Sequence, residues 1–324
     1  MEMVWRRIRE SVERHRRAAL VSVIDVIGSA PREVGARMVV QHHGSVSGSV
    51  GGGRLEYEAL AIAEVALSAE TTEAAVHVWP LGPNLGQCCG GSVTILVETF
   101  DAGDLDGIRE LAAAEETGPF GTISRLTEQG RMAREILGDE SGSRTSVSKG
   151  SIKQPFAERF GEARNTVLLF GAGHVGRALV LALSQLPFSV RWIDTRADQF
   201  PDYAPANVAI VNTDAPEGQI ETAPAGAFVL VMTHSHPLDY SITADALRRP
   251  DLGFVGLIGS DTKRARFTSQ ALKLGLCERQ IARLVCPIGL QEIKGKEPCI
   301  IAAAVAAQLL IERERPRHQA LVPN

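Results

Sequence analysis

Two adjacent cysteines on a glycine-rich segment, Gly86-Gln87-Cys88-Cys89-Gly90-Gly91, have the most distinctive chemistry in the sequence. Neighbouring cysteines rarely bridge each other well, because the linkage strains the peptide between them. They also lack the paired C-x2-C spacing of structural zinc sites. One or two soft thiols remain, which suit a soft metal, a sulfur-transfer partner or redox chemistry, and two buried small hydrophobic side chains are the structural alternative. Gln87 adds an amide that could hydrogen-bond a heterocycle.

A second glycine-rich segment, Gly48-Ser49-Val50-Gly51-Gly52-Gly53, is followed by Arg54 and Glu56 where a helical pattern begins. Three consecutive glycines allow backbone amides to converge on an anion, and the start of a helix adds a partial positive charge. This segment therefore predicts a phosphate site, with a flexible turn as the alternative.

A dinucleotide-type fingerprint, Gly171-Ala172-Gly173-His174-Val175-Gly176, follows an apolar strand and opens a helix. Its glycines allow a tight turn and the close approach of a pyrophosphate to the backbone. Asp194 ends the next strand, where an acid can bind a ribose 2′-hydroxyl. His174 could contact phosphate or cap the helix. The alternative is a Rossmann scaffold whose glycines serve only strand–helix packing.

Three later segments follow predicted strands, where open α/β sheets build their sites. Thr233-His234-Ser235-His236 with Asp239 has metal-ligand side chains in a loose pattern. Gly259-Ser260-Asp261 leads into a helix with Lys263, Arg264 and Arg266, which is either an anion site or a capped helix with a solvated basic face. Cys286 follows the last strand and is either an inert core residue or a ligand.

The elements that must position these residues differ between the two halves of the chain. Residues 1–137 alternate β-like runs with glycine-rich turns and two helical patterns, which predicts a smaller α+β domain. Residues 121–126 and 131–137 are expected to pair as a hairpin. Residues 138–160 begin with a stretch rich in serine and glycine, and we expect a flexible linker there.

Strand and helix patterns alternate regularly in residues 161–324. Short β-branched runs of this kind, separated by helical patterns, predict a Rossmann-like, doubly wound parallel sheet. A closing helix is expected from Pro298 to Glu312. The fold class is therefore α/β.

The composition and charge of the chain exclude or disfavour several classes of protein. The 324 residues are 44% hydrophobic and 22% charged, which excludes a wholly disordered or fibrous protein. The formal net charge of −4 gives no support for a nucleic-acid or membrane-surface role. Five cysteines leave at least one thiol free, and Arg6 and Arg7 are not followed by an apolar targeting segment, so we expect a cytoplasmic protein. A homodimer is the ordinary expectation for such a chain.

The motifs together resemble the xanthine dehydrogenase accessory protein family, the XdhC/CoxI family, and its XdhC branch in particular. Residues 48–53 with Glu56 are similar to the family signature G-[ST]-[IV]-G-G-G-x-x-E, and residues 85–91 match L-G-Q-C-C-G-G. In the second half, residues 170–176 resemble F-G-A-G-H-V-G, and residues 232–236, 258–260 and 286–290 fit as well. The resemblance covers nearly the whole chain in order. One departure is Arg54, where many relatives carry a cysteine.

This resemblance implies a molybdenum cofactor chaperone that acts in xanthine dehydrogenase maturation and hence in purine catabolism. Such a protein binds molybdopterin, protects it, supports its sulfuration with a cysteine desulfurase, and inserts it into the molybdenum-binding subunit of apo-xanthine dehydrogenase. It is an accessory factor and not an enzyme. The implied cofactor contacts are Gly51–Gly53, Glu56 and Gln87, with Cys88 or Cys89 near molybdenum.

The Rossmann half could bind the cofactor's dinucleotide or phosphate end through Gly171, Gly173, His174, Gly176 and Asp194. Two other classes of protein compete with this interpretation. An NAD(P)-dependent oxidoreductase would use the same fingerprint for hydride transfer, with His234 or His236 as its acid. A scaffolding protein would bind the dehydrogenase equally well with or without cofactor.

Overall fold

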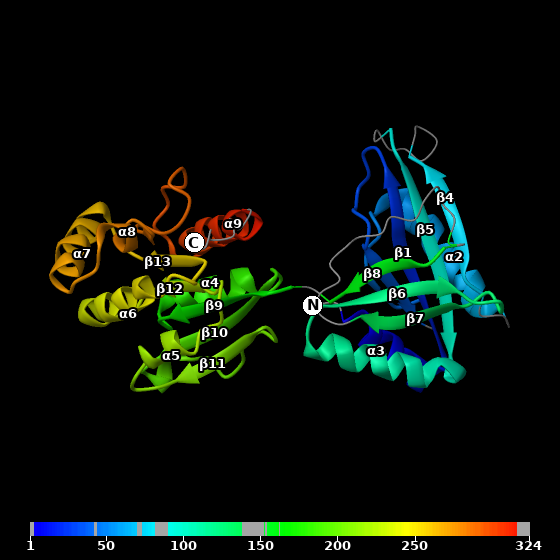
Figure 1. Ribbon diagram of the computed structural model, residues 1–324, viewed down its shortest axis with the longest axis horizontal. Coiled ribbons are helices and arrows are strands. Elements are labelled where there is room, and N and C mark those ends of the chain that lie inside the picture. The colour runs from blue at the N-terminus through cyan, green and yellow to red at the C-terminus, as the bar shows by residue number, and fades with distance from the viewer. Residues whose placement is uncertain are drawn as a thin grey trace, which may run out of the picture. The chain divides into compact units, whose positions relative to one another are not determined.

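The computed structural model describes residues 3–41, 44–69, 73–81, 90–137, 152, 154–161 and 163–315. The chain divides into two compact units, Met1–Ala163 and Arg164–Asn324, which are drawn together in Figure 1 and described separately below.

The first unit is built on a five-stranded sheet whose neighbouring strands are all antiparallel, in the order β3-β2-β1-β5-β4. The strands are β1 (Arg17–Ile27), β2 (Arg37–Gln41), β3 (Val46–Gly48), β4 (Ala75–Pro80) and β5 (Ser92–Asp101). Both faces of β1 are covered, so its apolar run is nearly continuous instead of alternating. The helices are α1 (Val4–His15), α2 (Gly53–Ser68) and α3 (Leu105–Thr117), with a short 3-10 turn η2 (Ala102–Asp104) before α3.

The two faces of this sheet are covered by different helices (Figure 1). On one face, Val21 and Val23 pack with Leu55 and Ala59 of α2. On the other face, α1 and α3 share a core with β1 and β5 that includes Trp5. The expected α+β architecture of the first half is therefore confirmed.

A second, three-stranded sheet in the order β7-β6-β8 completes the first unit. Its strands are β6 (Phe120–Leu126), β7 (Met132–Leu137) and β8 (Phe156–Phe160), and β6 and β7 form the predicted hairpin. The prediction of a linker over 138–160 is wrong at its end, because β8 belongs to this sheet and buries Phe156 and Phe160. The boundary between the units falls after Ala163, and residues 138–151 lie outside the described residues.

A buried cluster of four charged side chains joins the two sheets of the first unit. Arg134 of β7 donates to both carboxylate oxygens of Glu98 on β5, at 2.8 and 2.7 Å. The same guanidinium donates to Glu158 of β8 at 2.9 Å, and Arg37 of β2 reaches Glu158 at 3.2 Å. The side chains of Arg134, Glu98 and Glu158 are all less than 5% exposed. Two positive and two negative charges thus compensate each other inside the protein.

The second unit contains a six-stranded parallel sheet in the order β11-β10-β9-β12-β13-β14. The strands are β9 (Asn165–Phe170), β10 (Phe188–Asp194), β11 (Val208–Asn212), β12 (Phe228–Val231), β13 (Phe254–Leu257) and β14 (Leu284–Val285). This order reverses between β9 and β12, as it does in Rossmann folds. The predicted Rossmann-like sheet is confirmed.

Helices cover both faces of the parallel sheet (Figure 1). They are α4 (His174–Leu183), α5 (Gly218–Glu221), α6 (His236–Arg248), α7 (Asp261–Lys273), α8 (Glu278–Ile281) and α9 (Pro298–Glu314), with a 3-10 turn η4 (Ala197–Gln199). Alternate residues of β9 divide between the faces: Leu169 packs with α4 and α9, and Phe170 packs with α6 and α7. None of the helices in the described part of the chain combines the length and the apolar character that crossing a bilayer requires.

Candidate functional site

Three connections meet at one end of the five-stranded sheet in the first unit. The connection after β1 passes so close to the start of β5 that a Cβ atom on Gly91 would lie 2.5 Å from the carbonyl oxygen of Ile27 and would also strike that of Ser29. The same connection touches the glycine loop before α2, because a Cβ on Gly51 would lie 3.1 Å from Cβ of Pro31. The residues 27–31 therefore contact both glycine-rich segments that the sequence analysis singled out.

The cysteine-bearing segment is attached at this end of the sheet. The amide of Leu81 donates to the carbonyl of Gly91 at 2.7 Å, which fixes the two described ends of the segment side by side. Gln87, Cys88 and Cys89 lie outside the described residues, so their expected contacts remain predictions. Gly90 follows them directly and is exposed, and among the described residues beyond its chain neighbours none has an atom within 4 Å of the position its Cβ would take.

The glycine loop before α2 has a backbone that favours glycine at three successive positions. The φ angles of Gly51, Gly52 and Gly53 are +138°, +70° and +59°. A side chain is disfavoured at such angles. Apart from its chain neighbours, no described residue has an atom within 4 Å of the Cβ position of Gly52, so this part of the loop presents bare backbone.

Glu56 occupies the inner side of this loop. Its Oε2 accepts hydrogen bonds from the Ser49 hydroxyl at 2.6 Å and from the amides of Val50 and Gly52 at 3.0 and 3.2 Å. Partial burial raises the pKa of the Glu56 carboxyl, but the hydrogen bonds from Ser49 and the backbone outweigh it, and the net pKa lies below its usual value. The anion expected in the loop is thus supplied by the chain itself, and Glu56 shapes the loop from within.

Replacing Glu56 by glutamine should lower the free energy of unfolding of the first unit by about 1–2 kcal/mol at pH 7, because charge-assisted hydrogen bonds are lost. The lowered pKa of Glu56 means that its contribution is present above the usual pKa of a glutamate and is lost as the pH falls through the lowered value. The difference in urea unfolding between the wild type and Glu56→Gln should therefore begin to shrink as the pH falls below about 4, toward the lowered pKa. The control is Glu64→Gln, an exposed position on the same helix, and an equal loss in both variants would contradict this assignment.

In the second unit, two glycines of the fingerprint serve packing. A Cβ on Gly171, whose φ is +118°, would strike the carbonyl of Met232, and a Cβ on Gly176 would strike the carbonyl of Gly171. The indole Nε1 of Trp192 also donates to that Gly171 carbonyl, at 3.0 Å. Gly173 alone of the three has open space at its Cβ position, with no atom of another described part of the chain within 4 Å. This loop is therefore closed on its inner side and open to an approaching group at Gly173.

The carboxylate of Asp194 is hydrogen-bonded to other residues of the chain. Its Oδ2 accepts from the amide of Ala172 in the glycine loop at 2.7 Å, and Arg196 donates to both carboxylate oxygens at 3.0 Å. Burial raises the pKa of Asp194, but the bonds from Arg196 and the Ala172 amide outweigh it and hold the pKa below its usual value. The residue is 5% exposed, and the adjoining cavity of about 10 Å³ holds one water at most. His174 is the exposed first residue of α4.

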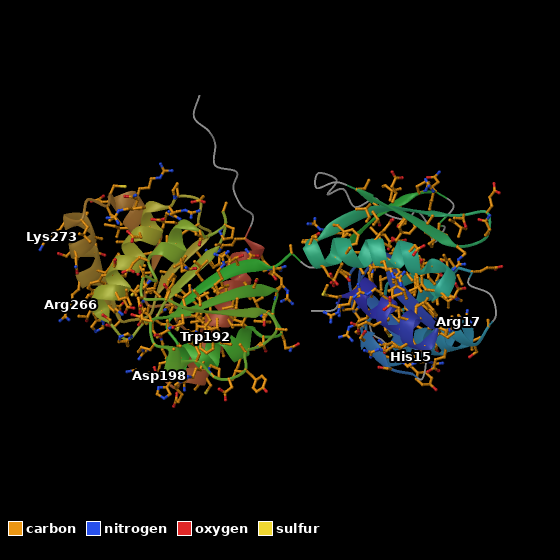
Figure 2. The ribbon with its side chains drawn as sticks, turned by 90° about the horizontal axis from the view of Figure 1, so that it is seen from below. His15, Arg17, Trp192, Asp198, Arg266 and Lys273 are labelled. Atoms are coloured by element: carbon orange, nitrogen blue, oxygen red, sulfur yellow. The ribbon has the colours of Figure 1, made fainter. Side chains whose placement is uncertain are left out.

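We expect Asp194→Asn to destabilise the second unit by about 2 kcal/mol at pH 7, because a buried, charge-assisted link between the glycine loop and Arg196 is lost. Since the pKa of Asp194 is lowered, this deficit should shrink as the pH falls below about 4. Native-state hydrogen exchange of the peptide 165–173 measures it. Asp198, a nearby exposed carboxylate labelled in Figure 2, provides the control Asp198→Asn, which should change little.

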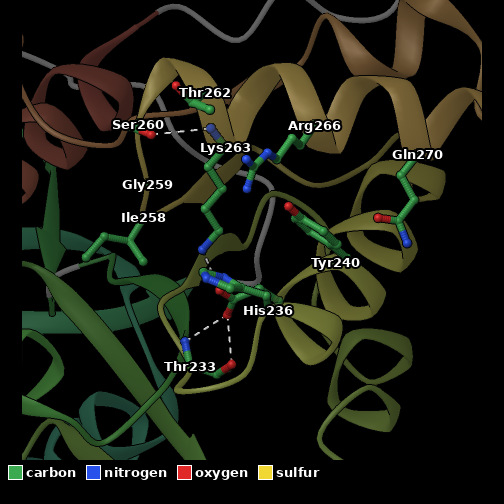
Figure 3. Close-up of a pocket in the computed structure, with 11 residues that line it drawn as sticks. Thr233, His236, Tyr240, Ile258, Gly259, Ser260, Thr262, Lys263, Arg266 and Gln270 are labelled. Carbon is green, nitrogen blue, oxygen red and sulfur yellow. Dashed lines mark hydrogen bonds and ion pairs between the residues drawn. The ribbon is translucent and has the colours of Figure 1, made fainter.

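A larger cavity of about 880 Å³ lies at the carboxyl ends of β12 and β13 (Figure 3). Its floor holds Asp239, which is 1% exposed and accepts from the amide and hydroxyl of Thr233 at 2.9 and 2.8 Å. The ammonium of Lys263 donates to the other Asp239 oxygen at 2.6 Å. Arg264, grouped with Lys263 in the sequence analysis, does not line this cavity and instead lies 3.4 Å from the carbonyl of Cys286.

The histidine motif does not form a metal centre. His236 lines the larger cavity and His234 the smaller one, while Asp239 is committed to Thr233 and Lys263. Within the described ranges, no group of three or more His, Cys, Asp or Glu side chains is arranged to hold a metal ion. Cys286 is 1% exposed, and burial raises the pKa of its thiol, as expected for an inert core cysteine.

Sequence reasoning missed the Asp239–Lys263 ion pair and the role of Arg196. The two members of the ion pair are 24 positions apart and meet only because β12 and β13 are neighbours in the sheet. The sequence did contain a signal for this ion pair, since Asp239 and Lys263 both follow strands whose carboxyl ends lie at the same edge of the sheet.

Comparison with known proteins covers both units. Residues 11–78 match the model of the XdhC and CoxI family, and residues 167–309 match the model of the XdhC Rossmann domain. The protein YqeB of Escherichia coli K12, described as uncharacterized, is 25% identical over 298 residues, which are 90% of this chain and 43% of that protein. The chain thus spans less than half the length of this relative.

A solved structure shows the same fold. A Bacillus halodurans protein described as a xanthine dehydrogenase superposes with a TM-score of 0.77 and 23% identity, covering 100% of this chain and 98% of that one. The two family matches fall in separate units and follow the order of the motifs along the sequence. The chain belongs to the XdhC and CoxI family.

Proposed function

We propose that this protein is a maturation factor for a molybdenum-containing xanthine dehydrogenase. In this proposal it binds the molybdenum cofactor, supports its sulfuration together with a cysteine desulfurase, and delivers it to the apoenzyme, without catalysing the dehydrogenase reaction itself. Family membership in both units carries the proposal. We expect it to act in the cytoplasm as a homodimer.

The connections at the end of the five-stranded sheet are suited to such a cofactor. The bare backbone of Gly52 and the exposed Gly90 leave room for a bulky group close to the main chain. When bound, the cofactor supplies a metal–dithiolene centre, a pterin and a phosphate. We assign Cys88 or Cys89 to the metal or the exchanging sulfur and Gln87 to the pterin.

In this proposal the glycine loop before α2 does not enclose the phosphate, contrary to what the sequence alone suggested. Because Glu56 already accepts from the amides of Val50 and Gly52, a phosphate would lie against the first turn of α2, beginning at Gly53, and not inside the loop. Glu56 then acts as a positioning residue that holds the loop open, and Gly51 allows the loop to pass Pro31. This division of roles distinguishes residues that touch the cofactor from residues that shape its surroundings.

A dehydrogenase activity of the Rossmann unit has less support. Both carboxylate oxygens of Asp194 are engaged by Arg196 and Ala172, so a ribose hydroxyl would have to displace an internal bond. Gly171 and Gly176 are explained by packing. Of the fingerprint residues, Gly173 and His174 remain accessible to a phosphate.

Activation of an apo-xanthine dehydrogenase tests the proposed function. The apoenzyme would be mixed with cofactor-loaded protein, or with an equal amount of free cofactor, in the presence of a cysteine desulfurase and cysteine. We expect several-fold more activity from the loaded protein, because carriage protects the cofactor and promotes its sulfuration. Equal activity from free cofactor and from loaded protein would contradict the proposal.

A further inference from the structure

No residue of the glycine fingerprint lines the large cavity of the second unit, although Thr233, which does line it, lies beside Gly171. The cavity has no role in the proposed function. It lies between the beginnings of α6 and α7, where Thr233 and Ile258 follow neighbouring strands (Figure 3). A volume of about 880 Å³ is in the upper part of the range of small-molecule sites. Most of the residues that line it have polar or charged side chains, and an apolar ligand would leave these groups without partners.

The charge in this cavity is positive and partly uncompensated. The ammonium of Lys263 is paired with the carboxylate of Asp239, and their side chains are 12% and 1% exposed. Arg266, one turn further along α7, also lines the cavity (Figure 3). No hydrogen bond or ion pair of its guanidinium is found within the described residues. The pair leaves Lys263 with two more N–H donors, and Arg266 contributes a full positive charge.

The backbone favours an anion at the same place. Two helices of 13 residues, α6 and α7, begin at the rim, and the N-terminus of each carries a partial positive charge. The Ser260 hydroxyl accepts from the amide of Lys263 at 3.3 Å and so caps one of the first-turn donors of α7. The remaining first-turn amides need acceptors from outside the helix.

We propose that this cavity binds a phosphate monoester. Arg266 and the start of α7 hold the phosphate, and Lys263, positioned by Asp239, donates a further hydrogen bond. Tyr240, His236 and Ile258 line the space that the organic group would occupy. A nucleoside monophosphate and a pterin phosphate share this chemistry. The inference is independent of the proposed cofactor site, since every residue involved belongs to the second unit.

Titration of the full-length protein followed by phosphorus NMR tests the inference with three probes: methyl phosphate, adenosine monophosphate and 6-hydroxymethylpterin phosphate. We expect methyl phosphate to bind, and one of the two larger probes to bind more tightly, which identifies the source of the phosphate. The variant Arg266→Gln should weaken binding of every probe at least tenfold, as expected for a charge-assisted pair. Lys273→Gln removes the same charge from the far end of α7 and should change affinity less than twofold (Figure 2).

A second variant distinguishes an effect on phosphate binding from an effect on folding. Gln270→Glu introduces a negative charge at an exposed position of the cavity wall and should weaken phosphate binding several-fold without a change in melting temperature. The inference is overturned if none of the three probes binds, or if Arg266→Gln and Gln270→Glu both bind as the wild type does. It is also overturned if Lys273→Gln weakens binding as much as Arg266→Gln, because the effect would then be one of overall charge.

Discussion

Replacing Arg134 by methionine should destabilise the first unit by about 3–5 kcal/mol, because it leaves two buried carboxylates without their shared partner. Arg134 forms hydrogen bonds with both Glu98 and Glu158, which come from different sheets. The remaining guanidinium, that of Arg37, contacts Glu158 alone within this cluster. Hydrogen exchange of peptides from β1 and β5 under native conditions measures the loss in the first unit separately from the second.

The pH dependence of this variant identifies the cause. Burial raises the pKa of Glu98, and removal of Arg134 would raise it further, so the carboxyl should take up a proton at mildly acidic pH. The deficit of Arg134→Met should therefore shrink between pH 7 and about pH 5. The exposed Arg125 on β6 provides the control Arg125→Met, which should cost less than about 0.5 kcal/mol. A deficit that is independent of pH would point to lost packing and against buried charge.

Gly91→Ala should also have a large effect, with a loss of about 2–4 kcal/mol. A methyl group at Gly91 would strike the backbone carbonyls of Ile27 and Ser29, and Ile27, the last residue of β1 to pair with β5, cannot move without distorting that pairing. Urea unfolding followed by hydrogen exchange of β1 measures this loss. Gly90→Ala is a closely matched control, because no atom of the described residues beyond its chain neighbours lies within 4 Å of that Cβ position.

The comparison of the two glycine variants bears on the proposed cofactor site as well as on stability. Gly91 fixes one end of the segment that carries the paired cysteines, through the bond from Leu81. If Gly91→Ala were as stable as Gly90→Ala, the close approach of the two connections would be incorrect, and with it the gathering of the glycine-rich segments at one end of the sheet.

Much of the fold could be predicted from periodicity, and the errors have physical causes. The strands of the parallel sheet are buried on both faces, which gives continuous apolar runs that are easy to recognise. The strand β8 could not be recognised from the sequence, because it follows a long stretch of serine and glycine. Phe156 and Phe160 of this strand are buried by partners that lie far away in the sequence. The four-residue ion cluster could not be predicted, since charged residues in a strand ordinarily face solvent.

The glycine-rich loops of the candidate site could be predicted from the sequence. The roles of the acidic residues beside them could not. The sequence pattern places Glu56 and Asp194 beside glycine loops, where an acid can serve either a ligand or the loop itself. In both units the carboxylate accepts hydrogen bonds from amides of its own glycine loop. Such loops expose amides that need an acceptor, and a short acidic side chain nearby meets that need within the chain. A motif alone does not distinguish these two uses.

In the proposed function, the first unit carries the molybdenum cofactor through its paired cysteines. The most direct measurement is the molybdenum and pterin content of the protein after incubation with free cofactor and removal of the excess, compared between Cys88→Ala/Cys89→Ala and Cys277→Ala/Cys299→Ala. The second variant is the matched control, because Cys277 and Cys299 are exposed free cysteines of the other unit.

We predict near-stoichiometric retention by the wild type and by the control, and a loss of at least tenfold when Cys88 and Cys89 are replaced. Thermal unfolding would be recorded for each variant, so that a loss of cofactor is compared only between proteins of equal stability. Equal retention by both variants would contradict the thiol assignment, and no retention by the wild type would contradict the claim that this protein carries the cofactor.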